Sequence, residues 1–450
     1  MSALSQYLPF YKRNLKIALP IMLSQAGQVL VQQADNMMVG AVGSTELAAC
    51  AFANSIFMIV MVLSMGFTFS ITPIVGQSFG KGNLNKTASL LYNSFIANII
   101  IILVISVIMY SVSFFMKKMG QPPEVANLAI NYYRILVISM IPFQIFYVFK
   151  QFSEGLGSTI YAMIITLAVN IVNIALNYVL IYGKFGFTPL GLDGAGYATL
   201  IARIFMPILF VIIFFKIRKF KKFTLLALKS KINFSEIKKI INLGWPISSQ
   251  MLLEVSAFSI SAIMIGWIGK DQLAAHQVAL GLASTVYMIA TGIGSASTIR
   301  VSHQYSKKEF QDMKKAAYAS IHMVFLFMST SATLFIVFKD ILPILYTKET
   351  EIITIASQLI IYAAMFQFFD GLQLVVLGVL RGMSDVKHAM IYSFISYIII
   401  NIPIGYILAF VFNLGANGIW IGFILGLGSA SILFYNRFKK IYSKTLLNNI

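Results

Sequence analysis

Two stretches of sequence decide the fold: Pro20–Gly40 reads PIMLSQAGQVLVQQADNMMVG, and Pro246–Gly266 reads PISSQMLLEVSAFSISAIMIG. Each is a largely apolar segment with one acidic residue, and the two begin 226 residues apart. The same offset, without a gap, pairs Gly43 with Gly269, Leu47–Ala49 with Leu273–Ala275, Ala53 with Ala279, Gly66 with Gly292 and Lys81 with Lys307. Prolines and glycines that match from Pro20 to Lys81 indicate an internal repeat.

The composition is that of a chain whose solvent is largely lipid. Of its 450 residues, 58% are hydrophobic and only 11% are charged, and the mean hydropathy is +0.83. A soluble domain carries about 25% charged residues, so this chain has too little polar surface to face water on all sides. The composition excludes intrinsic disorder and a nucleic-acid-binding domain, and the single cysteine, Cys50, excludes an internal disulfide.

Apolar runs long enough to cross a bilayer recur along the whole chain. A spanning helix needs about 20 mostly apolar residues. Twelve such spans are predicted: Leu15–Val42, Ala48–Val75, Ala88–Ser113, Glu124–Phe149, Thr159–Tyr182, Asp193–Phe215, Ile240–Ile268, Ala274–Ile299, Lys314–Phe338, Glu349–Leu377, His388–Phe412 and Asn417–Arg437.

The positive charges predict the orientation of these spans. An even number of spans puts both termini on one side, and the loops and tails of that side hold 26 of the 34 Lys and Arg residues, against six on the other. Because cytoplasmic loops are enriched in Lys and Arg, we expect both termini in the cytoplasm. The net charge of +19 therefore reflects topology, and we expect no nucleic-acid partner.

The repeat predicts two lobes of six spans each, an N-lobe over residues 1–215 and a C-lobe over 240–450, joined by a basic cytoplasmic linker over 216–239. Both copies enter the membrane in the same sense. Two such lobes are expected to be related by an axis along the membrane normal and to enclose a central cavity. This all-α architecture of two pseudosymmetric lobes suits alternating access.

Three acidic side chains lie inside predicted spans and away from the span ends: Asp35, Glu254 and Asp370. A charge at the centre of a spanning helix costs at least about 2.5–3.5 kcal/mol on insertion scales. Such residues usually face a polar interior and bind ions, protons or charged ligands. The alternative is a protonated carboxyl group that is hydrogen-bonded between helices.

Asp35 has polar residues at its own depth. Asn170, Asn173 and Asn177 share one face of the fifth span. Counted from the outer ends of their spans, Asp35, Asn173, Asn177 and Thr199 lie about 8–14 Å below the outer surface. One carboxylate with amide and hydroxyl oxygens can hold a small cation such as Na⁺, chiefly through Asp35, Asn173 and Asn177. Spacing alone leaves open an interhelical hydrogen-bond cluster without an ion.

Two prolines interrupt predicted spans, and the four histidines are spread along the chain. Pro20 and Pro246 lie inside the first span of each lobe and lack the N–H of a helical hydrogen bond, so each predicts a kink. The four histidines show no metal-binding spacing, and Gly80–Gly82 lacks the upstream glycine of a nucleotide-binding loop. The chain is therefore not predicted to be an enzyme.

Together these residues resemble the multidrug and toxic compound extrusion family, and within it the NorM-like branch. The resemblance covers nearly the whole chain and is carried by Pro20 through the segment DNMMVG (Asp35–Gly40), by LAAHQ (Leu273–Gln277), and by Glu254 and Asp370. It implies an antiporter that expels organic, mostly cationic compounds while Na⁺ or H⁺ enters.

The resemblance also assigns roles to residues. It implies an N-lobe cation site at Asp35, Asn173, Asn177 and Thr199, and a C-lobe cation or substrate site at Glu254 and Asp370. Gln277 matches a glutamine that lines the cavity in some members, and Asn170 is expected to line it as well. Phe366 departs from the family pattern, because a tyrosine often stands four residues before the acid of the tenth span.

The leading hypothesis is secondary active multidrug efflux, of the kind that confers antibiotic resistance, by a monomer in the cell inner membrane. Its partners would be organic cations and membrane lipid, and it would need a coupling ion, Na⁺ or H⁺, rather than a cofactor. A flippase for polyprenyl-linked saccharides would share the architecture. It would be expected to have cationic residues in the cavity, and only Arg134 and Arg203, which lie inside spans and away from the span ends, are candidates. A receptor or scaffold would bind ligand without gradient-driven flux.

Overall fold

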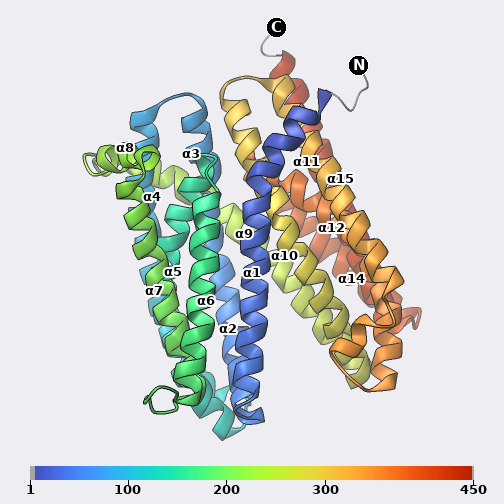
Figure 1. Ribbon diagram of the computed structural model, residues 1–450. Helices are drawn as coiled ribbons and strands as arrows, with labels where there is room; N and C mark the ends of the chain where they lie inside the picture. The colour runs from blue at the N-terminus through green and yellow to red at the C-terminus, as the bar shows by residue number, and fades with distance from the viewer. Residues whose placement is uncertain (1–5, 448–450) are drawn as a thin grey trace. The chain divides into compact units, whose positions relative to one another are not determined.

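The computed structural model describes residues 6–447, and within that range the chain is helical and contains no β-strand (Figure 1). The chain ends, predicted to be cytoplasmic, lie outside the described residues. The helices of the first half are α1 (Leu8–Gly40), α2 (Ser44–Phe69), α3 (Ile71–Gly80), α4 (Leu84–Val112), the short 3₁₀ turn η2 (Met116–Lys118), α5 (Pro123–Gly155), α6 (Ile160–Tyr182) and α7 (Gly191–Lys216).

The second half repeats this series after a short helix in the predicted linker, α8 (Arg218–Ala227). Its helices are α9 (Phe234–Ile268), α10 (Lys270–Ser306), α11 (Phe310–Val337), the 3₁₀ turn η3 (Leu342–Leu345), α12 (Thr350–Gly382), α13 (Val386–Phe394), the π-helical segment η4 (Ile395–Asn401), α14 (Ile402–Tyr406), the π-helical segment η5 (Ile407–Val411) and α15 (Gly415–Leu447).

Eleven helical segments of the described chain are long and apolar enough to cross a membrane. Helices are required there because the hydrocarbon offers no hydrogen-bond partners to the backbone. The remaining predicted span, Leu15–Val42, lies in α1, which has 33 residues but carries four glutamines beside Asp35 and Asn36. Together these helices supply the twelve predicted spans, and the prediction of an all-α integral membrane fold is confirmed.

The chain divides into two compact units at the same point of each repeat. One unit comprises Leu23–Ser248, and the other comprises the chain up to Met22 together with everything from Ser249 onward. Helices α1 and α9 therefore each run from one unit into the other, two residues beyond Pro20 and Pro246. The lobes and linker drawn from the repeat differ from these units and stay a prediction.

A matched pair of glycines explains how the first parts of α1 and α9 pack. A Cβ atom on Gly292 of α10 would lie 2.7 Å from the backbone nitrogen of Met22, and one on Gly66 of α2 would lie 2.4 Å from the Cα of Ser248. Neither position has space for a side chain. The two contacts are related by the 226-residue offset, so the glycine match in the sequence reflects one close helix approach made twice.

Hydrogen bonds fasten these same helix segments within their units. Asn14 of α1 donates to the carbonyl of Ala316 and to Ser320 Oγ of α11, both at 2.9 Å. In the other unit, Ser248 Oγ of α9 donates to the carbonyl of Leu63 at 2.8 Å. In both units, therefore, side-chain polar groups add to the close packing at glycine.

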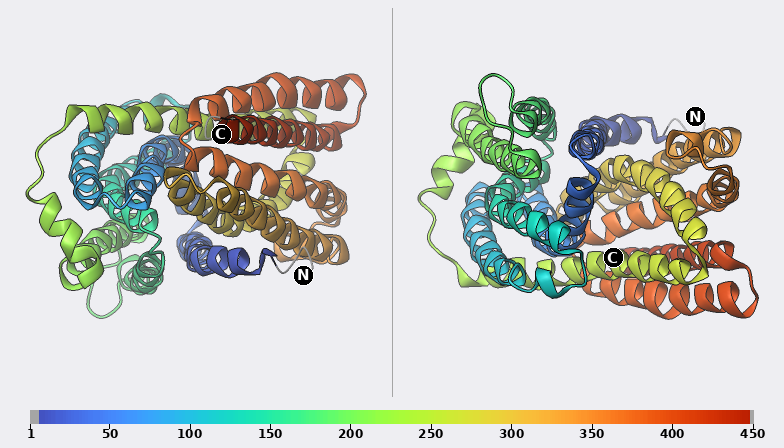
Figure 2. Two further views of the ribbon diagram at one scale, coloured as in Figure 1. Left: turned by 90° about the horizontal axis from the view of Figure 1, so that it is seen from above. Right: turned by 90° about the horizontal axis from the view of Figure 1, so that it is seen from below.

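The centre of each unit is occupied by the same element of the repeat. Helix α5 packs against α2, α4 and α7, while α12 packs against α10, α11 and α15; Figure 2 shows the helices from above and from below. Buried aromatic side chains of α5 and α7, including Phe146, Phe152, Phe210 and Phe214, fill the interior of the first unit. Helix α7 in turn packs against α6, which carries Asn173 and Asn177.

Candidate functional site

The half-buried Asp35 on α1 and two buried asparagines on α6 form a polar cluster. Asn177 Nδ2 donates a 2.5 Å hydrogen bond to Asp35 Oδ1 and lies 3.4 Å from Asn173 Oδ1. Asn177 is fully buried and Asn173 is 5% exposed. The four-residue spacing of the asparagines places both on one helix face. Three of the four residues predicted for the N-lobe site therefore lie together.

The cluster holds amide atoms whose hydrogen-bonding capacity is unmet. Asn177 Oδ1 and Asn170 Nδ2 are buried, and neither has a hydrogen-bond partner among residues 6–447. Buried polar groups are normally paired, so an unpaired amide oxygen beside a carboxylate fits a site that receives a cation. Thr199 on α7 is half-buried, and within the described chain it makes no side-chain hydrogen bond to Asp35 or to the asparagines.

Arg203, one helical turn after Thr199 on α7, is a component that sequence reasoning did not assign to this site. Its Nη1 donates to Ser139 Oγ of α5 at 2.7 Å, and its guanidinium lies 4.5 Å from the ring centre of Phe143 and 5.3 Å from that of Phe57. The side chain is thus fixed inside the unit, where its charge interacts with Asp35. The four-residue spacing from Thr199 was the available signal.

In the other unit, Glu254 on α9 lies at one end of a polar chain. Gln250 Nε2 donates to Glu254 Oε2 at 3.0 Å, and Arg381 Nη2 of α12 donates to Gln250 Oε1 at 2.6 Å. The side chain of Tyr287 on α10 also interacts electrostatically with Glu254. Gln250 lies one turn before Glu254, a spacing that could have revealed it, whereas no sequence pattern links Arg381 to α9.

Asp370 on α12 is 3% exposed, and its carboxyl group interacts electrostatically with that of Glu254. The two acids predicted for the C-lobe site therefore share one buried region of the same unit. Two carboxylates there repel each other unless a proton or a cation lies with them. Gln367, one turn before Asp370, has neither side-chain atom paired among the described residues.

Phe366, the departure from the family pattern, lies in an aromatic cluster. Its ring centre is 5.7 Å from that of Trp420, 6.2 Å from that of Phe423 and 6.2 Å from that of Phe258. An apolar ring fits these neighbours, because a buried hydroxyl would need a hydrogen-bond partner. The substitution removes an oxygen from the region of Asp370.

The segment LAAHQ (Leu273–Gln277) lies in the first turns of α10. Two adjacent residues in it differ in burial. Gln277 is exposed, whereas His276 is fully buried against Trp420 and Phe423. The exposure of Gln277 is compatible with the expected cavity-lining role, which stays a prediction. Pro20 and Pro246 lie inside α1 and α9, and both helices continue through them.

The donor set limits what the site can hold. No group of three or more His, Cys, Asp or Glu side chains placed to hold a metal ion occurs between residues 6 and 447. A cation at Asp35 would be held by one carboxylate and by amide oxygens such as Asn177 Oδ1. Such a weak ligand set suits an ion that must bind and leave.

Comparisons with known proteins extend over almost the whole chain. The MatE family model matches residues 20–179 and again 246–407, so the two matches begin 226 residues apart, at Pro20 and Pro246. The multidrug resistance protein NorM of Photobacterium profundum is 31% identical over 96% of this chain and 95% of its own length. The multidrug resistance protein MdtK of Photorhabdus laumondii is 30% identical, with 96% of each chain covered.

A solved structure has the same fold. The crystal structure of a MATE protein in the straight conformation aligns with a TM-score of 0.90 at 20% identity, covering 97% of each chain. At this identity the likeness concerns the path of the backbone, which agrees with the helices described above.

Proposed function

Because the chain belongs to the MatE family, we propose that it is a secondary active multidrug efflux transporter, which exchanges Na⁺ or H⁺ for organic, mostly cationic compounds. The observation that carries the proposal is the pairing of the half-buried Asp35 carboxyl with the fully buried Asn177, whose own Oδ1 has no partner among the described residues. Intramembrane acids of this kind bind ions and protons.

We propose that Asp35, Asn173 and Asn177 bind the coupling cation, with Thr199 as a further ligand. The carboxyl group supplies the charge and the amide oxygens complete the shell. When the cation leaves, Asn177 Nδ2 donates a hydrogen bond to the Asp35 carboxyl group, as in the 2.5 Å contact between these two side chains. The same side chain would therefore serve the empty and the loaded site by presenting its amide nitrogen or its amide oxygen.

The second acid pair, Glu254 and Asp370, is proposed to bind the cationic substrate or a second coupling ion. Gln250 and Arg381 hold Glu254 in position through the polar chain. Aromatic side chains nearby, such as Phe366 and Phe258, offer ring faces to an organic cation. Gln277 and Asn170 are proposed to line the substrate cavity.

Coupling follows from competition for negative charge. A cation that binds from the outside neutralises the carboxylates and lowers their affinity for a positively charged substrate. The substrate is then released to the outside. Linkage requires the reverse as well, so substrate binding from the inside expels the coupling ion. An inward-negative membrane potential assists the entering cation by about 2.3 kcal/mol per charge for each 100 mV.

Alternating access needs helices that bend where they pass between the units. We propose that α1 and α9 bend near Pro20 and Pro246, where no proline N–H ties one helical turn to the next. The close contacts at Gly66 and Gly292 would keep the preceding helix segment fixed in its own unit while the rest of the helix moves. We further propose a monomer in the cell inner membrane with both termini cytoplasmic.

The test is transport by the purified protein in liposomes, with a Na⁺ gradient and a pH gradient imposed separately while a fluorescent organic cation is followed. We expect accumulation of the dye against its own gradient with at least one of the two ions. Dye flux that depends on neither the Na⁺ gradient nor the pH gradient would overturn the proposal. A complete absence of dye flux in folded protein would overturn it as well.

A further inference from the structure

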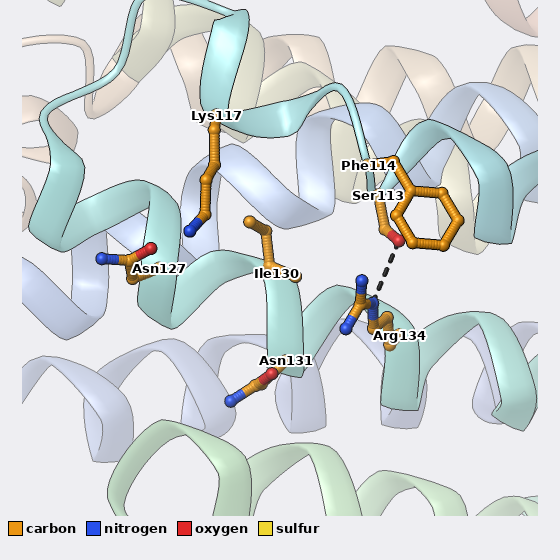
Figure 3. A pocket seen from close by; sticks show the side chains of 7 residues that line it. All are labelled: Ser113, Phe114, Lys117, Asn127, Ile130, Asn131 and Arg134. Carbon is orange, nitrogen blue, oxygen red and sulfur yellow. Dashed lines mark hydrogen bonds between the residues drawn. The ribbon is translucent and has the colours of Figure 1, made fainter.

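A pocket of about 400 Å³ lies where α4 ends and α5 begins, well apart in sequence from the acids described above. Figure 3 shows its lining: Ser113, Phe114, Lys117, Asn127, Ile130, Asn131 and Arg134. Asn127, Ile130, Asn131 and Arg134 follow the i, i+3, i+4, i+7 pattern and so form one face of α5. The chain around η2 supplies the opposite wall with Lys117.

The polar lining is cationic and has no acid. Arg134 Nε donates to the neutral Ser113 Oγ at 3.0 Å, and the guanidinium lies 5.3 Å from the ring centre of Tyr110 and 5.4 Å from that of Phe114. These contacts fix the side chain but leave its charge without a counter-ion in the lining. Among residues 6–447, Lys117 takes part in no ion pair. Glu124, in the first turn of α5 and three residues before Asn127, does not line the pocket.

Apolar side chains on the last turns of α4 and on the chain that follows it are exposed. Val107 is 68% exposed, Phe114 is 63% exposed and Phe115 is 59% exposed. Phe114 lines the pocket and Phe115 follows it in the chain, while Val107 lies on α4, seven residues before Phe114. In a membrane protein, exposed apolar faces of this kind contact acyl chains. A charged pocket thus adjoins a lipid-facing strip.

We propose that this pocket binds the phosphate of an anionic phospholipid in the outer leaflet. Lys117 and Arg134 pair with the phosphate oxygens, Asn127 and Asn131 donate amide hydrogens, and the acyl chains lie along Val107 and Phe114. The opposite charges of lining and ligand, together with the adjoining apolar strip, favour a lipid over a free anion. Basic pockets between spanning helices bind anionic headgroups on the cytoplasmic or matrix side, and the proposal extends the same chemistry to the opposite side of the membrane.

The distribution of charge along the chain supports this assignment. Only six Lys and Arg residues lie in the loops predicted to face outward, and Lys117 and Lys118 are two of them. Lys117 and Arg134 therefore place two positive charges close together on the side of the membrane that is predicted to have few basic residues.

The test is native mass spectrometry of the full-length protein released from micelles that contain phosphatidylglycerol, phosphatidylcholine or inorganic phosphate. We expect wild-type protein to retain phosphatidylglycerol and neither of the others. The double variant K117Q/R134Q should lose about thirtyfold in retention, and K117Q alone about fivefold, because each surface charge contributes on the order of 1 kcal/mol. K117Q alone controls for misfolding of the double variant, because Lys117 is exposed and its substitution should leave the fold intact.

The matched control is K184Q/K348Q, which removes two exposed lysines that do not line the pocket. It should retain phosphatidylglycerol as the wild type does. Equal losses in the two double variants, or equal retention of phosphatidylcholine, would overturn the proposed site. Retention of inorganic phosphate as strong as that of the lipid would overturn the role of the acyl chains and leave only an anion site.

Discussion

At the scale of single residues, the depth of polar side chains in their spans predicted which of them meet. Asp35, Asn173 and Asn177 were placed at one level of the membrane by counting residues, and the hydrogen bond from Asn177 to Asp35 joins them. Counting depth gives no direction around the helix, so it could not separate Thr199, which is half-buried, from Arg203, which is fixed by Ser139.

The chain from Arg381 through Gln250 to Glu254 makes a prediction about stability and transport together. Gln250→Ala removes the group that bonds both Arg381 and Glu254, which leaves two buried charged groups with fewer partners. The expected loss is about 1–3 kcal/mol of stability, seen as a lower midpoint of thermal unfolding, with slower efflux at temperatures where the variant is folded.

Gln121→Ala is the control for this change, because Gln121 is exposed in the loop before α5. It should leave the unfolding midpoint and the efflux rate at wild-type values. If Gln250→Ala matched the control in both measurements, the polar chain would have no role in positioning Glu254.

At the scale of helices, hydropathy predicted where the spans lie but not where the helices end. The span predicted at Asn417–Arg437 lies within α15, which extends over Gly415–Leu447, because an amphipathic helix can continue into water beyond the apolar run. Likewise, the span predicted at His388–Phe412 contains two π-helical segments, on either side of Pro403. A local change of helix type leaves the mean hydropathy unchanged and so has no signature in it.

The paired glycines give a prediction at this scale. A single methyl group in Gly292→Ala would lie 2.7 Å from the backbone nitrogen of Met22, and in Gly66→Ala it would lie 2.4 Å from Ser248 Cα. Because backbone atoms cannot yield as a flexible side chain can, each variant should unfold at a clearly lower temperature, with a cost of about 1–3 kcal/mol.

Gly281→Ala on α10 is the matched control, since its new methyl group would lie 3.7 Å from the nearest atom, an ordinary contact. Alanine favours the helix over glycine by up to about 1 kcal/mol, so this variant should be as stable as the wild type or more stable. Equal midpoints for all three variants would contradict the close approach at Gly66 and Gly292.

At the scale of the whole molecule, the internal repeat was predictable because prolines and glycines keep their spacing, and the family model finds both copies. The sequence did not predict to which unit the first segments of α1 and α9 belong. The segment before Pro20 belongs to the unit formed by the second half of the chain. An apolar helix carries no mark of which neighbour it packs against until contacts such as Asn14 with Ser320 are seen.

Orientation is tested by labelling with a maleimide that does not cross membranes, in a Cys50→Ala background that removes the chain's single cysteine. Lys118→Cys is expected to react in intact cells, and Lys231→Cys only after the cells are opened, because the positive charges favour a cytoplasmic linker. Both positions are exposed. The reverse pattern would invert the topology.

The most direct test of the central claim, that Asp35 couples ion entry to efflux, is the ion-driven accumulation of a fluorescent organic cation in liposomes that contain wild-type or Asp35→Asn protein. The account predicts that the variant is folded, as its unfolding midpoint would show, and that its accumulation falls to the level of protein-free liposomes. Asp340→Asn, which changes an exposed loop acid paired with Lys339, should transport as the wild type does. Wild-type accumulation by Asp35→Asn would contradict the account.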